Sequence, residues 1–425
     1  MRFFYFYNMK IEDLHKLYLA HGLVDTDTRK IRNNTIFFAL KGENFNGNSF
    51  AGEAIAKGAS YAVIDEEKYA TSDKIILVEN VLETLQQLAN YHRNYLKLPV
   101  IALTGSNGKT TTKELINAVL STKYKTTATI GNLNNHIGVP LTLLSMKRNT
   151  EIGIVEMGAN HQKEIAFLSE IASPDYGYIT NFGSAHLEGF GSLEGVVKGK
   201  SELYDFLKKH SKKVFVNPND EKQVEITNCM DVIYFSKEVK FINANPLIEL
   251  SYNNQEIKSN LIGKYNFTNI AAAITIGEYF NVSVEEIKNA IESYIPSNNR
   301  SQIIKTKSNK IILDAYNANP TSMKAAIESF EALNGEYKTI ILGDMFELGE
   351  YSSEEHQKIV DLVESKNFDD VILVGENFYK TKTSSKKIKS FQDLSDYLKS
   401  NQIEDSTILV KGSRGMALER VVEFC

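Results

Sequence analysis

A lysine and three threonines directly follow a glycine-rich turn in the run Thr104–Thr112. The apolar run Val100–Leu103 before it is typical of a buried strand, and the residues after it have helical spacing. In such a strand–turn–helix unit, backbone N–H groups surround a phosphate, the lysine neutralises it and a hydroxyl reaches Mg²⁺. The alternative is a tight glycine turn with a surface lysine. The pattern predicts a phosphate-binding loop made of Gly105, Ser106, Asn107, Gly108, Lys109, Thr110 and Thr111.

Two further side chains follow predicted strands. Glu156 ends the apolar run Ile152–Glu156, and His186 lies shortly after the run Tyr176–Thr180. Ligands of open α/β sheets bind beyond the carboxyl ends of strands, where a carboxylate suits Mg²⁺. Glu156 is therefore a candidate metal ligand, and the alternative is a solvated glutamate. His186 could bind metal, act as a base or cap a loop, and its spacing alone favours the loop.

Lys200 occupies an unusual place in a predicted helix, Leu193–Lys209. It falls inside the apolar stripe of that helix, whereas Lys198 lies outside it. The other members of the stripe are Leu193, Val196, Val197, Leu203, Tyr204 and Leu207. Burial lowers the pKa of an amine and favours its neutral, nucleophilic form. The alternative is a lysine that reaches solvent from the edge of the stripe.

Three more polar residues stand where a nucleotide could be contacted. Asn269 lies at the start of a predicted helix (Thr268–Phe280), Arg300 follows the turn-rich run Tyr294–Asn299, and Asp314 follows a short strand. Asparagines at a helix start are equally typical of caps. After Asp314, Asn319-Pro320 predicts a helix with an N-cap and proline at its first position. Ser352 with Glu355 matches a capping box.

The order of the predicted elements indicates an α/β protein of three domains. A small α/β unit covers residues 1–80 and a parallel-sheet unit with the phosphate loop covers 81–298. A regular strand–helix series over 299–425 predicts a Rossmann-like unit, which ends in a helix at Ala417–Val422. Between Phe215 and Ile262 the sequence is polar and strand-like. The run Tyr294–Asn299 predicts a hinge between the last two units.

The amino-acid composition excludes several classes of protein. The 425 residues are 42% hydrophobic and 24% charged, with a net charge of −5, which offers no general attraction to nucleic acid. Two cysteines, Cys229 and Cys425, exclude a disulfide framework and suit a reducing compartment. No apolar run approaches membrane-spanning length. We expect a cytoplasmic, monomeric enzyme without nucleic-acid or membrane partners.

The order of motifs resembles that of the Mur ligases, the ATP-dependent amide-forming enzymes of peptidoglycan precursor synthesis. The similarity covers essentially the whole chain. Its segments are Thr26–Arg29 with Phe38–Glu43, Thr104–Thr112, Gly131–Pro140, Glu156–His161, His186–Leu193, Asp314–Pro320 with Leu342–Gly349, and Lys411–Arg414.

This resemblance implies a UDP-substrate domain, a central P-loop-type ATPase domain and a Rossmann-like domain that brings in an amine. It implies ATP, two Mg²⁺ ions, UDP-N-acetylmuramoyl-tripeptide and D-alanyl-D-alanine as ligands. Lys109, Lys200 and His186 match catalytic residues, and Lys200 matches a carbamylated lysine. Thr110, Glu156, His186 and Lys200 match metal ligands, and Asn269, Arg300 and Asp314 match nucleotide contacts. Substrate-binding segments contain Thr28, Arg29, Asn46, Asn134 and Asn135.

The sequence departs from the family pattern in places and leaves alternatives open. Tyr265 stands where histidine is frequent, and Ala315 where serine or aspartate is. The rival functions are another Mur-type ligase, a folylpolyglutamate-type ligase and a P-loop NTPase switch. The tripeptide-forming enzyme commonly carries Asp-Asn-Pro-Arg, a run that is absent here. A switch module has no need of Lys200 in an apolar stripe.

Overall fold

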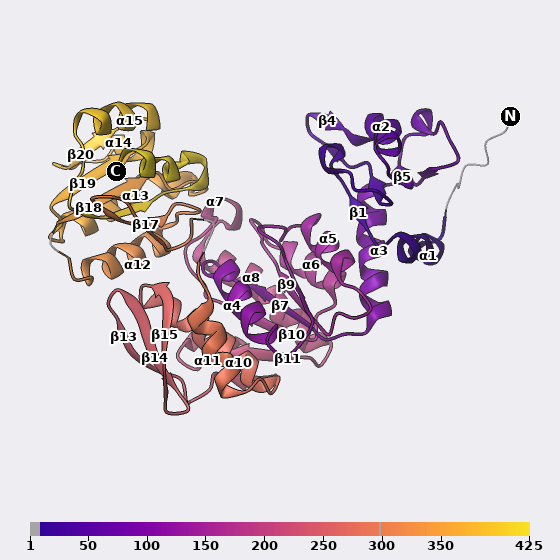
Figure 1. The fold of residues 1–425 in the computed structure, drawn as a ribbon, viewed down its shortest axis with the longest axis horizontal. Coiled ribbons are helices and arrows are strands. Elements are labelled where there is room, and N and C mark those ends of the chain that lie inside the picture. The colour runs from indigo at the N-terminus through magenta and orange to yellow at the C-terminus, as the bar shows by residue number, and fades with distance from the viewer. Residues whose placement is uncertain (1–8, 297–298, 336) are drawn as a thin grey trace.

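The computed structural model describes residues 9–296, 299–335 and 337–425. It is an α/β structure with three lobes, in which the N-terminal and C-terminal lobes stand on opposite sides of a central one (Figure 1). The predicted hinge, Tyr294–Asn299, includes Ser297 and Asn298, which lie outside the described residues.

The N-terminal lobe is built on a parallel sheet in the order β1-β2-β5-β6. The central residues of this sheet are wholly apolar and buried, as expected of parallel strands covered by helices. Its elements are α1 (Ile11–His21), β1 (Val24–Asp25), η1 (Thr28–Lys30), β2 (Ile36–Phe38), β3 (Lys41–Gly42), β4 (Phe45–Asn46), η2 (Gly47–Phe50), α2 (Ala51–Ala56), β5 (Tyr61–Ile64), η3 (Glu67–Tyr69) and β6 (Ile75–Leu77).

Helix α3 (Val81–Leu96) connects this lobe to the central one, and its His92 forms a buried pair with His15 of α1. His92 Nε2 is 2.9 Å from the carbonyl oxygen of Met146, so it must carry the proton and donate. Its Nδ1 is then an acceptor for His15 Nε2 of α1, 3.0 Å away. Both imidazoles are neutral in this arrangement, and they join α1, α3 and the end of α5 (Gly138–Ser145).

The central sheet has six parallel strands in the order β12-β11-β10-β7-β9-β8. Strand β7 lies in the middle and leads into the glycine-rich turn, as predicted. The strands are β7 (Val100–Thr104), β8 (Thr126–Ala128), β9 (Ile152–Glu156), β10 (Tyr176–Ile179), β11 (Lys213–Val216) and β12 (Asp231–Tyr234).

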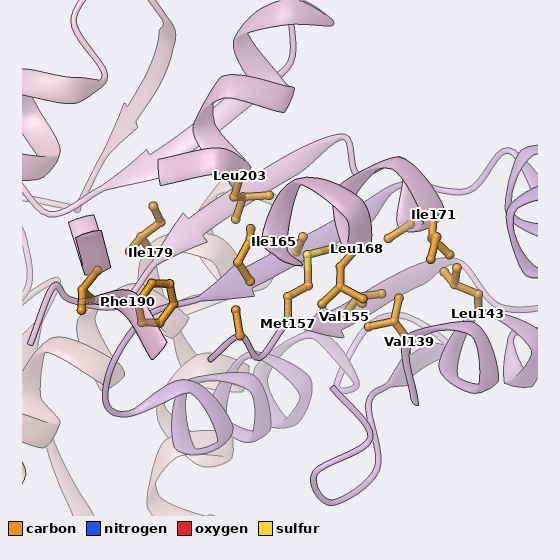
Figure 2. Close-up of a cluster of buried hydrophobic side chains, with 14 of the residues drawn as sticks. Val139, Leu143, Val155, Met157, Ile165, Leu168, Ile171, Ile179, Phe190 and Leu203 are labelled. Atoms are coloured by element: carbon orange, nitrogen blue, oxygen red, sulfur yellow. The ribbon is translucent and has the colours of Figure 1, made fainter. Parts of the chain in front are cut away.

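Helices cover both faces of this sheet. Figure 2 shows one face, where Val155 and Ile179 of the strands meet Ile165, Leu168 and Leu203 of the helices. The helices on that side are α5, α6 (Glu164–Ala172) and α8 (Leu193–Lys209). The short helix α7 (Leu187–Phe190) directly precedes α8. The opposite face packs on α4 (Lys109–Leu120), α10 (Tyr265–Tyr279) and α11 (Val284–Ser293).

Two expectations for this region need correction. The polar segment after Phe215 does form strands, but a short helix interrupts it: α9 (Glu221–Ile226) precedes an antiparallel sheet of β13 (Lys240–Ala244), β14 (Leu247–Tyr252) and β15 (Gln255–Ile262). Helix α10 starts at Tyr265 rather than Thr268. Asn269 therefore lies one turn inside the helix and is not its N-cap.

The C-terminal lobe carries six strands in the order β16-β17-β21-β18-β19-β20, all parallel except the edge pair β16–β17. The strands are β16 (Gln302–Lys305), β17 (Lys310–Asp314), β18 (Lys338–Gly343), β19 (Asp370–Val374), β20 (Lys386–Ile388) and β21 (Thr407–Lys411). The helices are α12 (Pro320–Glu331), α13 (Ser352–Glu364), α14 (Glu376–Tyr379) and α15 (Phe391–Ser400), with the 3₁₀ turns η4 (Gly349–Tyr351), η5 (Arg414–Met416) and η6 (Leu418–Phe424).

Of three helix predictions for this lobe, one is confirmed and two are wrong. Asn319 caps α12, with Pro320 at its first position, as predicted. The Ser352 capping box is wrong, because Ser352 is itself the first helical residue and Tyr351 is the N-cap. The end of the chain is 3₁₀ rather than α-helical. None of the helices in the described ranges combines the length and apolar composition needed to cross a membrane.

The His15–His92 pair predicts loss of stability in acid. Burial, and then the neighbouring His92, lower the pKa of His15 from 6.5 to about 4. The unfolded chain therefore binds the proton first as the pH falls below 6.5, and stability decreases down to about pH 4. By linkage, the loss at pH 5 is roughly 2 kcal/mol.

Urea unfolding between pH 5 and 7.5 measures this loss. His15→Gln keeps an N–H donor without a titrating group, so we expect a flatter pH dependence. His161→Gln removes an exposed histidine and serves as the control. Equal pH dependence of His15→Gln and wild type contradicts the prediction.

Candidate active site

The register of the central sheet places the ends of three strands at one edge. β7 pairs with β9 and β10, with Leu103 opposite Glu156 and Thr104 opposite Ile179. The loops that follow these strands are therefore neighbours, and Ser106 N donates to Asn181 O across them at 3.0 Å. They line a cavity of about 960 Å³, which residues of the C-terminal lobe close from the other side.

The glycine-rich loop has the backbone that a phosphate cradle requires. Gly105 and Gly108 have φ of 140° and 78°, and a Cβ on Gly105 would lie 2.0 Å from Thr180 Oγ1. Lys109 Nζ is folded back on the loop, 2.8 Å from Gly105 O and 3.3 Å from Ser106 O. Burial lowers its pKa. A bound phosphate offers this amine stronger acceptors than the two carbonyl groups.

Glu156 is buried, with 1% of its surface exposed, which excludes the solvated reading. Its Oε1 accepts hydrogen bonds from Thr110 Oγ1 at 3.2 Å and from Asn134 Nδ2 at 2.8 Å. Its Oε2 is buried and has no hydrogen-bond partner among the described residues. An unpaired buried carboxylate oxygen is costly unless a cation or a donor completes it.

These oxygen donors fit Mg²⁺. In the described residues, no three His, Cys, Asp or Glu side chains gather closely enough to form a protein-only metal site. Mg²⁺ sites commonly use one or two carboxylates together with substrate phosphates and water. The unpartnered Glu156 Oε2, beside the hydroxyl of Thr110 at the phosphate loop, is such a partial site.

His186 lies at the start of α7 with a left-handed backbone, φ 54°. Its side chain caps nothing in that helix. Instead, Nδ1 lies 2.5 Å from Oε2 of Glu347 in the C-terminal lobe. The carboxylate approaches out of line with the ring N–H, so this is a close polar contact rather than a straight hydrogen bond. His186, and then Lys109, lower the pKa of the Glu347 carboxyl.

Lys200 is fully buried on α8, which excludes the solvent-reaching alternative. Its Nζ donates to Ala159 O at 2.9 Å and lies 4.9 Å from the ring centroid of Phe190. Burial, and then Lys109, hold the pKa of this amine well below its usual value. Lys198 is exposed, as predicted, whereas Leu193 of the predicted stripe is also exposed. Ala159 lines the cavity, so the amine lies just beneath its wall.

The nucleotide candidates meet at the boundary with the C-terminal lobe. Asn269 Oδ1 accepts from Thr112 Oγ1 at 3.1 Å, and its amide lies against Gly108. The Arg300 guanidinium stacks on the Tyr316 ring, 3.7 Å from its centroid. Asp314 forms an ion pair of 2.6 Å with the buried Lys411. All of these except Thr112 line the same cavity.

The substrate candidates divide into two groups. Asn134 and Asn135 line the cavity, and Asn135 Oδ1 accepts from the N–H groups of Ile137 and Gly138. Thr28, Arg29 and Asn46 do not line it. The guanidinium of Arg29 pairs with Asp27, at 2.8 Å.

Asn46 has a structural use that the sequence did not reveal. Its amide oxygen caps η2 by accepting from Asn48 N, and its Nδ2 donates to Glu66 Oε1 at 2.8 Å. In this arrangement the side chain organises its own loop, and one amide N–H is left for any other contact.

Sequence reasoning missed several residues that complete the cavity. Glu347, Tyr316, Thr321 and Lys411 all line it. Glu347 and Lys411 follow or end parallel strands of the C-terminal sheet, which is the signal that identified Glu156. The pairing of Glu347 with His186 depends on how the two lobes dock.

Comparisons with known proteins agree with this architecture. Three family profiles match: the Mur ligase catalytic domain over residues 22–93, the Mur ligase middle domain over 103–277 and the Mur ligase glutamate ligase domain over 299–414. A relative from Bacillus subtilis (strain 168), UDP-N-acetylmuramoyl-tripeptide–D-alanyl-D-alanine ligase, is 37% identical over 95% of this chain and 93% of its own length. The chain belongs to the Mur ligase family.

Further members of the family also match this chain over more than nine-tenths of its length. The Escherichia coli (strain K12) enzyme of the same name is 33% identical over 94% of this chain and 92% of its own. The structure of MurF from Acinetobacter baumannii matches with a TM-score of 0.83 at 30% identity, covering 94% of this chain and 92% of that one. MurF from Thermotoga maritima in complex with ADP gives 0.84 at 28% identity, covering 96% and 97%.

For this Mur ligase, the buried Glu156 predicts a strong dependence on its charge. Glu156→Gln keeps the shape but cannot neutralise a metal ion. We expect kcat to fall by about 10²-fold or more, as is typical when a metal contact in the transition state is lost. Phosphate release measured over a range of Mg²⁺ concentrations tests this.

Glu194→Gln, which removes an exposed carboxylate from the start of α8, is the matched control. Near-normal activity of Glu156→Gln at limiting Mg²⁺ contradicts a ligand role for this carboxylate.

Proposed function

We propose that this Mur ligase joins the amino group of D-alanyl-D-alanine to the terminal carboxyl of UDP-N-acetylmuramoyl-tripeptide, while ATP is converted to ADP and phosphate. Relatives that carry this reaction in their names cover more than nine-tenths of the chain. The observation that carries the proposal is the buried, half-satisfied carboxylate of Glu156 beside Thr110 at the phosphate loop, in a cavity shared with the amine-delivering lobe.

The first chemical step needs charge neutralisation. A carboxylate is a poor acylating agent, and it is repelled by the triphosphate that it must attack. Mg²⁺ bound by Thr110, Glu156 and His186 would neutralise the phosphates and orient them for in-line transfer. Lys109 adds a positive charge after leaving the carbonyl groups of Gly105 and Ser106. The substrate carboxylate then attacks the γ-phosphorus, and an acyl phosphate forms as ADP leaves.

The second step joins the amine. The free amino group of the dipeptide attacks the acyl carbon, a proton is lost and phosphate departs from the tetrahedral intermediate. Water is the competing nucleophile and must be kept out. The C-terminal lobe already contacts the phosphate loop, because Asn319 Nδ2 donates to Asn107 Oδ1 at 2.7 Å. This docking supports a role for the lobe in both delivering the amine and covering the intermediate.

The reaction is tested by phosphate release with a panel of UDP-muramoyl peptides and dipeptides. We expect release that requires ATP, a UDP-muramoyl tripeptide and D-alanyl-D-alanine together. The panel includes tripeptides ending in diaminopimelate and in lysine. Equal turnover without either peptide partner contradicts the ligase reaction and favours an NTPase.

We further propose that Lys200 reacts with CO₂ to form a carbamate. Its neutral amine adds to the carbon of CO₂ and releases one proton, which gives a carboxylate-like group on a long arm. The buried amine with its lowered pKa and its place beneath the cavity wall support this modification. The new negative charge is stable only beside cations, which Lys109 and the metal supply.

Lys200→Ala should nearly abolish activity, with partial rescue by added acetate or formate, while Lys198→Ala should act like wild type. Enzyme equilibrated with ¹³C-bicarbonate should show a carbamate resonance that Lys200→Ala lacks. A wild-type protein without this resonance at neutral pH, and without loss of activity on CO₂ removal, contradicts the modification.

A further inference from the structure

The contact between His186 and Glu347 joins two lobes at the phosphate end of the cavity. Both residues have left-handed backbones, with φ of 54° and 64°, a conformation that costs free energy for non-glycine residues. The carboxylate lies 2.5 Å from Nδ1 of the imidazole. The two side chains therefore meet across the boundary between the central and C-terminal lobes.

The loop that carries Glu347 is fixed to the C-terminal lobe. Met345 N donates to His356 Nε2 at 3.0 Å, and Phe346 N donates to Ser413 Oγ at 2.9 Å. Asp344, at the start of the loop, accepts from two backbone N–H groups of α14. The position of Glu347 is therefore set by the lobe as a whole.

The segment around His186 is held by the same lobe on both sides. Ser184 N donates to Thr321 Oγ1 at 2.9 Å, and Glu188 N donates to the carbonyl oxygen of Glu347 at 3.2 Å. Further along, Tyr351 Oη donates to Gly191 O at 3.3 Å. His186 lies between these contacts, so docking of the C-terminal lobe determines the direction of its ring.

We propose that Glu347 is a positioning residue that holds His186 with its proton on Nδ1 and its Nε2 lone pair directed at Mg²⁺. A carboxylate oxygen 2.5 Å from Nδ1 attracts a proton and repels a lone pair there, so it favours the Nδ1–H form of a neutral imidazole even without a straight hydrogen bond. Metal-binding histidines are commonly oriented by a carboxylate on the second ring nitrogen. This inference rests on the proposed function, because it takes His186 as a metal ligand.

The consequence is a metal site that needs two lobes. Thr110, Glu156 and His186 belong to the central lobe, but the orientation of His186 comes from the C-terminal one. Metal affinity and docking of the amine-delivering lobe are then coupled: each strengthens the other.

The test uses Mn²⁺ bound to the full chain with a non-hydrolysable ATP analogue. Electron spin-echo modulation detects a nitrogen ligand on Mn²⁺, and titration gives the affinity. Glu347→Gln should weaken Mn²⁺ binding about 10-fold and reduce the nitrogen signal, as losses of carboxylate partners of metal-bound histidines do. Glu347→Asp, which keeps a carboxylate, should restore part of both. Glu350→Gln, which removes an exposed carboxylate from the adjacent turn η4, is the matched control and should change neither.

Other outcomes overturn the inference in distinct ways. If His186→Gln removes the nitrogen signal but Glu347→Gln leaves signal and affinity intact, Glu347 does not position the ligand. If Glu347→Gln raises only the KM for D-alanyl-D-alanine, the carboxylate contacts the substrate amine instead. If His186→Gln leaves the signal unchanged, His186 is not a ligand. Dipeptide-dependent phosphate release by the wild type still decides the ligase reaction separately.

Discussion

The parallel pairing of β7 with β9 and β10 fixes where the charged groups of the cavity can stand. Because all three strands run the same way, the phosphate loop, Glu156 and the segment leading to His186 leave the sheet at one edge. Hydrogen bonds between these loops, such as Ser106 N to Asn181 O, keep them in register. The apolar layers on both faces of the sheet make this arrangement rigid, since neither face can shift without exposing its core.

Around this edge the protein buries ionisable groups that lack partners of opposite charge. Glu156 has an unpartnered oxygen, Lys200 has only a carbonyl acceptor, and Lys109 binds its own loop. Burying Glu156 and Lys109 costs free energy, which is offset when Mg²⁺ pairs with the carboxylate and phosphate pairs with the amine. The proposed carbamate would turn the neutral Lys200 amine into an anion that these cations can balance. The folded protein therefore holds these groups ready to bind ligands of opposite charge. Such binding is needed because the substrate carboxylate and the triphosphate repel each other.

The C-terminal lobe lines the cavity and also contacts the segments of the central lobe that carry its charged groups. It contacts the phosphate loop through Asn319, the β10–α7 segment through Thr321, and the imidazole of His186 through Glu347. These three contacts are polar, and the Glu347 side chain is half exposed. Polar contacts of this kind can separate to admit substrates and then re-form.

The sequence alone determined the features that depend on neighbouring residues. The strand–turn–helix of the phosphate loop and the Asn319-Pro320 cap follow from hydrogen bonds and periodicity within single segments. The apolar stripe made Lys200 a candidate for burial, and the packing of α8 decided it. The predictions that failed, at Ser352 and at the end of the chain, concern helix ends. There a few competing hydrogen bonds decide which residue caps the helix and whether the last turn is α or 3₁₀. The tertiary structure decided which segments meet. Asn46 caps its own loop, and Glu347 reaches His186 only because two lobes dock. Contacts between residues far apart in the chain depend on the packing of whole sheets and lobes, and no local pattern encodes them.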